Sequence, residues 1–224
     1  MNTTQNTIVN SYALLDKTNP EYSQIKILQT SSNPVLEGKS APGKLYHSLT
    51  GKIYDTLDVV LMAVRLEFRV WSGDSIDQYP LFLSDDMKTL VQLDPKTGEK
   101  VGQEPLEQSE YWINRKQQKN AKTQYFFLGI LPKEKQLVFL RIGGMGFKRA
   151  KTFLNQARAS GKQLYQFVTR IGVGQENSAF GPKFVPEFTM TEIPVPGEFL
   201  EKIIPVCQNF LAQGNRAVPA LTTQ

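Results

Sequence analysis

Apolar and polar residues alternate most clearly from Leu57 to Trp71. Because successive side chains of a strand point to opposite faces, this period of two predicts a long strand that is buried on one face. We expect the buried face to hold Val60, Met62, Val64, Leu66, Phe68 and Val70, and the other face to end in Arg65, Glu67, Arg69 and Trp71. Residues 45–54, with a turn at Thr50-Gly51, are predicted to be the partner strand.

Further strands are predicted in the second half of the chain, at residues 123–131, 136–142, 163–173 and about 183–191. The first two flank Pro132–Lys135 and are expected to form a hairpin. Upstream, Ile25–Leu28 fits either a short strand or the end of a helix, and residues 31–43 are rich in Pro and Gly, which predicts a loop.

Two segments favour helices. After the glycine-rich turn Gly143–Gly146, the spacing of apolar residues predicts a helix at about 147–160, which Gly161 ends. A C-terminal helix is predicted from Pro196 to Gln213, with Pro205 kinking or dividing it.

These elements predict three parts of the chain. Residues 1–24, rich in Asn, Thr, Gln and Ser, are expected to be a flexible arm, and residues 193–224 to be a C-terminal helix and tail. Residues 25–192 are expected to form one domain, with a polar insertion at 84–121 that is partly ordered around Tyr111, Trp112 and Ile113. The order of the elements predicts a mainly β fold with α additions (α+β): an OB-type, partly open β-barrel with an inserted loop region and a C-terminal helix.

Positive charge is concentrated in one part of this 224-residue chain. Residues 122–192 contain 11 Lys and Arg against 4 Asp and Glu, whereas the insertion contains 6 against 7. The same basic stretch is crowded with aromatic residues. Since cations neutralise phosphates and rings stack on bases, this combination favours a single-stranded nucleic acid as partner. A β-rich core with a solvated basic rim explains the composition equally well.

The predicted helix at 147–160 carries part of this charge. Lys148, Lys151, Arg158 and Lys162 fall along one arc beside its apolar stripe, where they can follow a phosphate backbone. The alternative is a solubilising face. The glycine turn before the helix could hold a phosphate, but it lacks the spacing of dinucleotide or Walker loops, so we expect a plain turn.

The strands suggest a second binding surface. Tyr125 and Phe127 share one face of their predicted strand, and Tyr165 and Phe167 share one face of theirs. With Arg65, Arg69 and Trp71 they could form an exposed platform on which bases stack. The alternative is that the Phe residues face the core.

Little in the sequence supports catalysis or a cofactor. A single cysteine, Cys207, excludes an internal disulfide and a cysteine-based zinc site, and His47, the one histidine, is expected to be a surface or strand residue without a special role. Asp85 and Asp86 could hold a metal, as in a nuclease, but solvated turn acids are favoured. We expect no enzyme, no cofactor and no metal site. The N-terminus does not resemble a signal peptide and no segment fits a membrane span, so a cytoplasmic protein of a bacterial or phage-infected cell is expected.

The order of short motifs resembles single-stranded-DNA-binding proteins of bacteriophages and related mobile elements, which are built on an OB fold. The resemblance spans roughly residues 25–192 and rests on Gly38–Tyr46, Thr50-Gly51, the strand ending at Arg69-Val70-Trp71, Leu83–Asp86 before the insertion, and the Lys148–Lys151 helix. Some relatives of this type carry zinc-ribbon cysteines in the insertion, and many end in an acidic tail. This chain has neither, which puts a metal site and tail-mediated recruitment in doubt.

The sequence therefore predicts a single-stranded-DNA-binding protein of replication or recombination, largely independent of base sequence, with RNA left open as a ligand. A second copy or a replication or recombination protein is the further partner expected. The residues expected to contact phosphates are Lys44, Arg65, Arg69, Arg141, Lys148, Lys151 and Arg170, and those expected to stack on bases are Tyr46, Trp71, Tyr125 and Tyr165. The alternative is a structural or adaptor protein of a phage or mobile element that binds another protein through its basic face.

Overall fold

The structure, a computed structural model, describes residues 23–72, 79–179, 181–202 and 204–205. It is mostly β. The strands are β1 (Gln24–Ile27), β2 (Leu45–His47), β3 (Ile53–Tyr54), β4 (Leu57–Val70), β5 (Phe82–Ser84), β6 (Thr89–Leu93), β7 (Lys100–Pro105), β8 (Ala121–Leu131), β9 (Gln136–Gly143), β10 (Phe167–Ser178) and β11 (Gly181–Pro194). The helical segments are α1 (Asn33–Leu36), η2 (Leu106–Gln108), α2 (Glu110–Ile113), α3 (Gly146–Ala159), η3 (Leu164–Gln166) and residues 197–202.

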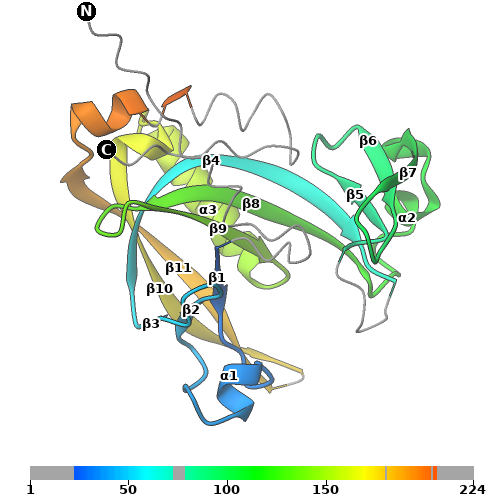
Figure 1. The fold of residues 1–224 in the computed structure, drawn as a ribbon, viewed down its shortest axis with the longest axis horizontal. Helices are drawn as coiled ribbons and strands as arrows, with labels where there is room; N and C mark the ends of the chain where they lie inside the picture. The colour runs from blue at the N-terminus through cyan, green and yellow to red at the C-terminus, as the bar shows by residue number, and fades with distance from the viewer. Residues whose placement is uncertain (1–22, 73–78, 180, 203, 206–224) are drawn as a thin grey trace, which may run out of the picture.

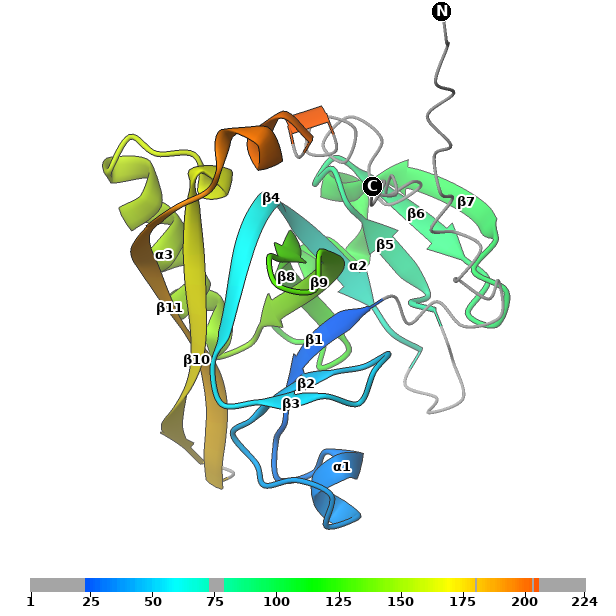
Figure 2. The same ribbon diagram turned by 60° about the vertical axis from the view of Figure 1, so that its left-hand side comes forward.

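The long strand β4 lies at the centre of the fold. It is antiparallel to β8 along most of its length and to β10 at its start, where Val59 faces Thr169. β9 follows β8 in the predicted hairpin, and β11 follows β10 in another. The spatial order β10-β4-β8-β9 is a Greek key, in which the fourth strand returns beside the first. Figure 2 shows the β10–β11 hairpin running beside the start of β4.

The N-terminal strands enlarge this arrangement on the side of β9. β1 runs parallel to β9, and β2 and β3 follow beyond it. The prediction that 45–54 pairs with β4 is therefore wrong, because β8 and β10 occupy both edges of β4. β1 and β11 do not pair as strands in the described chain, but the Gln29 amide bridges them: its Nε2 donates to the Phe184 carbonyl at 2.7 Å, and its Oε1 accepts from the Phe184 N–H at 3.0 Å. The sheet is thus open, with one side-chain bridge across the gap.

A β-bulge changes which residues of β4 share a face. The register with β8 shifts by one residue between Leu61 and Ala63, which leaves Met62 as the extra residue. Val60 and Met62 therefore pack in a cluster on one side of the sheet, whereas Val64 packs in the cluster on the opposite side. The prediction of one unbroken apolar face is wrong for this reason. The alternation from Val64 to Val70 holds.

Two clusters of buried residues lie on the two sides of the main sheet, which consists of β1–β4 and β8–β11. The larger one packs β4, β8, β9 and β10 against the buried face of α3, which presents Ala150, Phe153 and Ala157. Three of its aromatic rings form a row of contacts. The ring centroids of Phe127 and Phe188 are 5.7 Å apart, and those of Phe188 and Phe153 are 4.9 Å apart. The smaller cluster lies under the C-terminal helical residues, where Phe199 and Leu200 pack against it.

The polar insertion is more ordered than the sequence predicts. β5, β6 and β7, with η2 and α2, form a unit (residues 82–113, the insertion unit) that hangs from the far end of β4 and β8 (Figure 1). It has its own core of Leu90 and Leu106 against Phe68 and Val70. The expectation of order around Tyr111, Trp112 and Ile113 is confirmed, since all three lie in α2.

Helix α3 is confirmed nearly residue for residue, and Gly161 follows it with a positive φ of 70°. The predicted strand at 163–173 begins later, because residues 164–166 form the short helix η3. Residues 1–22 of the predicted arm lie outside the described residues, as do residue 203 and residues 206–213 of the predicted C-terminal helix, Cys207 among them.

Candidate nucleic-acid interface

The charged side chains on the exposed side of α3 are all basic. Between Gly146 and Lys162 the chain has five cations and no Asp or Glu. Arg149 pairs with Glu176 at 2.9 Å. The other four have no carboxylate within 4.0 Å in the part of the chain that the structure describes. We call these four residues the basic stripe: Lys148, Lys151, Arg158 and Lys162.

The position of the basic stripe follows from the packing of the helix. Gly146 sits where a Cβ atom would lie 2.9 Å from Pro186 of β11, so only glycine lets the helix start this close to the hairpin. With Ala150 and Ala157 also buried, the helix lies flat on the core. Lys148, Lys151 and Arg158 are then held on the solvent side of the helix at fixed spacing, about 1.5 Å of rise per residue, and Lys162 follows the end of the helix.

Tyr125 lies beside this helix and is half-buried. Its ring stacks on Phe147 at 4.6 Å with an interplanar angle of 19°. Burial raises the pKa of the Tyr125 hydroxyl, and the positive charge of Arg158 opposes this shift. The structure therefore places three predicted site residues, Tyr125, Lys148 and Lys151, at α3. Tyr125, however, packs against the helix through Phe147 and is not an open platform for a base.

Three predicted arginines gather on the other side of the sheet around one carboxylate. Glu67 is fully buried and accepts from Arg69 Nε at 3.0 Å and from Arg65 Nε and Nη2 at 3.3 Å, while Arg141 Nε lies 4.0 Å away. Burial lowers the pKa of the Arg65 guanidinium, and the negative charge of Glu67 opposes this shift. Phe126 lies between two of them, with Arg65 at 5.1 Å and Arg141 at 4.8 Å from the ring centroid.

This arginine cluster (Arg65, Arg69 and Arg141 with Glu67) has an excess of two positive charges, but it is not an exposed surface. The side chains of Arg65 and Arg69 are each 9% exposed, and that of Arg141 is 22% exposed. Part of their charge is already neutralised by Glu67. Arg141 is the member most accessible to a phosphate.

The sequence missed one cation next to this cluster. The register of β1 with β9, Ile25 opposite Leu140, places Lys26 next to Arg141, and Tyr46 lies opposite Lys26 on β2. Nothing local to residue 26 indicates this, because the pairing joins strands more than 100 residues apart. Tyr46 thus lies near Arg141, as the proposed site requires.

The remaining predicted residues are dispersed. Lys44 pairs with Asp55, and Arg170 forms a two-pronged pair with Asp58 at 2.8 and 3.0 Å. The Arg170 hydrogen bonds lower the pKa of Asp58. Trp71 lies past the end of β4, where its carbonyl accepts from Asn120 at 2.6 Å.

Tyr165 lies in η3 and packs against the smaller core cluster. Phe127 and Phe167 are buried in the larger core cluster. The single stacking platform predicted from Arg65, Arg69, Trp71, Tyr125 and Tyr165 is therefore wrong, because these residues lie on different sides of the sheet and in different elements.

The candidate metal and acid residues have structural surroundings. Asp86 lies in the turn between β5 and β6, where its Oδ1 accepts from the N–H groups of Lys88 at 2.7 Å and Thr89 at 2.8 Å. No group of three or more His, Cys, Asp or Glu residues suited to a metal occurs among the described residues. His47 was expected to be a surface or strand residue: it lies in strand β2, and it is fully buried rather than on the surface. Its Nδ1 accepts from the Thr50 N–H at 3.2 Å and its Nε2 lies 2.9 Å from Ser23 Oγ.

None of the helices that the structure describes is long and apolar enough to span a membrane. No protein-family model, curated protein or solved structure matches this chain.

Proposed function

We propose that this protein binds single-stranded DNA, largely independently of base sequence, on an OB-type scaffold. The observation that carries the proposal is the basic stripe: Lys148, Lys151 and Arg158 at helical spacing on α3, and Lys162 just past its end, without an acid in the same segment. Such a stripe fits a phosphate backbone, because clustered cations release counterions when phosphates replace them.

The connectivity supports the scaffold. An OB fold is a five-stranded, partly open Greek-key barrel. β4, β8, β9, β10 and β11 follow one another with a Greek key and a final hairpin, and α3 joins the third to the fourth. β1 lies on the free side of β9, as an addition to the five strands.

The pair Tyr46 and Arg141 favours a single strand over a duplex. Tyr46 on β2 and Arg141 on β9 lie near each other, with β1 between the two strands, and Tyr46 is half-buried. One ring and one cation are therefore close enough together for a base and its phosphate. Base stacking on rings requires unpaired bases, which a duplex does not offer. The protein makes and breaks no bond in this proposal; it holds and protects the strand.

The test is fluorescence anisotropy with a labelled oligo-dT and with the corresponding duplex, at low and high salt and without metal. Tighter binding of the single strand is expected. If the four cations of the basic stripe each neutralise one phosphate, the logarithm of the affinity should fall with the logarithm of salt with a slope of about −3. Equal, weak binding to both ligands would reduce the proposal to generic attraction. Absence of binding at low salt would overturn it in favour of a protein partner for the basic face.

A further inference from the structure

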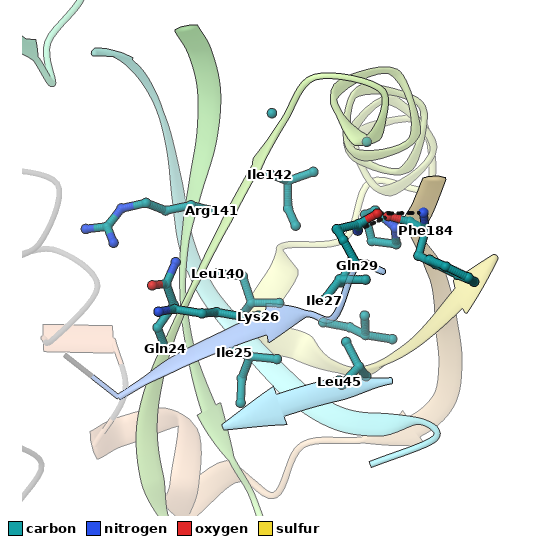
Figure 3. Close-up of a pocket in the computed structure, with 14 residues that line it drawn as sticks. Gln24, Ile25, Lys26, Ile27, Gln29, Leu45, Leu140, Arg141, Ile142 and Phe184 are labelled. Atoms are coloured by element: carbon teal, nitrogen blue, oxygen red, sulfur yellow. Dashed lines mark hydrogen bonds between the residues drawn. The ribbon is translucent and has the colours of Figure 1, made fainter. Parts of the chain in front are cut away.

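A cavity of about 330 Å³ opens where β1 separates from β9 (Figure 3). The two strands pair only at Gln24 with Phe139 and at Ile25 with Leu140. Beyond these positions they diverge, and the cavity lies between Ile27 on one strand and Ile142 on the other. Its volume is at the lower end of the range for small-molecule sites, which suits a group the size of one nucleoside.

The walls of the cavity are apolar and one of them is firmly held. Ile27, Ile142 and Ile171 line it together with Phe184 and Pro186 of β11. The backbone of Phe184 is fixed by both hydrogen bonds of the Gln29 amide. Its ring lies against Gly43, where a Cβ atom would come within 2.8 Å of it, so any other residue at position 43 would displace the ring.

Main-chain polar groups border the same cavity. Residues 24 and 28 of the β1 segment exchange hydrogen bonds with the β2 segment, as in Ser48 N–H to Gln24 and Leu28 N–H to Lys44. By the alternation of a strand, Ile27 then directs its N–H and C=O toward β9. Ile27 has no register partner in the described part of β9. A ligand in the cavity can thus meet a backbone donor and acceptor as well as apolar walls.

Positive charge lies at the outer opening of the cavity. Lys26 and Arg141 are neighbours across the two strands and both border it. Figure 3 shows the Arg141 side chain extending away from Ile142, toward the outer side of the sheet. On the inner side, the cavity reaches Gly143 and Gly146, at the start of the helix that carries the basic stripe.

We infer that this cavity receives one unpaired base of the bound strand, with Lys26 and Arg141 holding the adjoining phosphate. The inference rests on the proposed function. It follows from a combination that a base with its phosphate matches: apolar walls that include the Phe184 ring, hydrogen-bonding groups at the edge and cations at the mouth. A purely apolar ligand would leave the main-chain groups and the cations unused.

The test compares two oligonucleotides of equal length and charge, oligo-dT and an oligomer of abasic sites. The variant Ile27→Trp fills the cavity, and Ile53→Trp is the matched control, because Ile53 is exposed on β3 and does not border the cavity. A base in the cavity should contribute about tenfold to the preference of the wild type for oligo-dT, the gain expected from one well-placed base. Ile27→Trp should lower the preference by about this factor and keep the abasic affinity and the salt slope, while Ile53→Trp should keep all three.

A second measurement does not depend on a variant that folds. The wild-type protein is irradiated with oligo-dT that carries 5-iodouracil, and the cross-linked peptide is mapped. A cross-link to the β11 peptide that contains Phe184 is expected, and cross-links confined to other elements would overturn the inference. So would a folded Ile27→Trp that prefers oligo-dT as strongly as the wild type does, or a wild type that binds both oligomers equally. Only a wild type that binds neither oligomer would remove the proposed function as well.

Discussion

The main sheet, with α3 packed on it, and the insertion unit share the strand β4 but differ in charge and packing. The basic stretch 122–192 lies almost wholly in the main sheet and α3, whereas the insertion 84–121 has a slight acidic excess. The larger core cluster joins six strands and α3, while the insertion unit rests on a core of four buried residues at the end of β4. The difference indicates that global stability depends on the main sheet and that the insertion unit can be perturbed separately. The proposed phosphate binding also belongs to the main sheet and α3.

The largest effect is expected from the cores. Phe127→Ala removes a fully buried ring that contacts Phe188, and it should lower the free energy of unfolding by about 3–5 kcal/mol. Leu90→Ala should cost about 2–5 kcal/mol, but within the insertion unit. Hydrogen exchange would show faster exchange across the whole main sheet and α3 for Phe127→Ala, and only across residues 79–120 for Leu90→Ala.

These variants also separate function. Leu90→Ala should bind oligo-dT like the wild type, because the insertion unit holds none of the basic stripe. If Leu90→Ala binds much more weakly while hydrogen exchange in the main sheet is the same as in the wild type, the division between the two regions is wrong.

The next largest effect concerns the buried carboxylate. Glu67→Gln leaves Arg65, Arg69 and Arg141 without their shared counterion and should lower the free energy of unfolding by about 3 kcal/mol. Chemical denaturation measures this. Glu99→Gln is the control, since Glu99 is an exposed residue of the insertion, and an equal loss in both variants would contradict the role of Glu67.

A smaller effect is expected from pH. Burial lowers the pKa of His47 from its ordinary value of 6.5, so the folded protein holds this ring neutral. Below pH 6.5 the unfolded chain binds the proton first, and stability should fall by about 1.4 kcal/mol per pH unit until the folded ring is also protonated. His47→Gln should remove this part of the pH dependence between pH 6.5 and the range where carboxylates titrate. Identical pH profiles for the two proteins would show that His47 does not contribute.

The smallest effect is expected at Arg170. Its guanidinium is already paired with Asp58 on the surface of the main sheet. Arg170→Ala should therefore change the salt slope of DNA binding less than Lys151→Ala does. A larger change at Arg170 would mean that the phosphate path follows β10 rather than α3.

Local patterns in the sequence predicted much of the main sheet. The β8–β9 hairpin around Pro132–Lys135, the period of α3 and the stop at Gly161 depend on neighbours within a few residues, so they could be inferred. The bulge at Met62 could not, because it shows only in the register with β8. The predicted partner strand at 45–54 failed for a related reason: pairing depends on which edge is free in the whole sheet.

The residues of the candidate site also fall into those that local patterns could predict and those that depend on long-range pairing. Lys148 and Lys151 were predicted from a helical arc and are exposed on it. The arginines were predicted as free phosphate ligands from the alternation in β4, but a period of two does not show that Glu67 shares their face as a buried partner. Lys26 was missed because its neighbour Arg141 lies more than 100 residues away.

The most direct test of the account is the salt dependence of oligo-dT binding in two charge-reversal variants. Lys148→Glu/Lys151→Glu changes the basic stripe, and Lys88→Glu/Lys96→Glu makes the same change at two exposed lysines of the insertion. The account predicts that the first variant weakens binding and reduces the magnitude of the salt slope by about 1.4, the share of two phosphates on a single strand. It predicts a smaller loss and an unchanged slope for the second. Equal losses in affinity and slope for the two variants would contradict it.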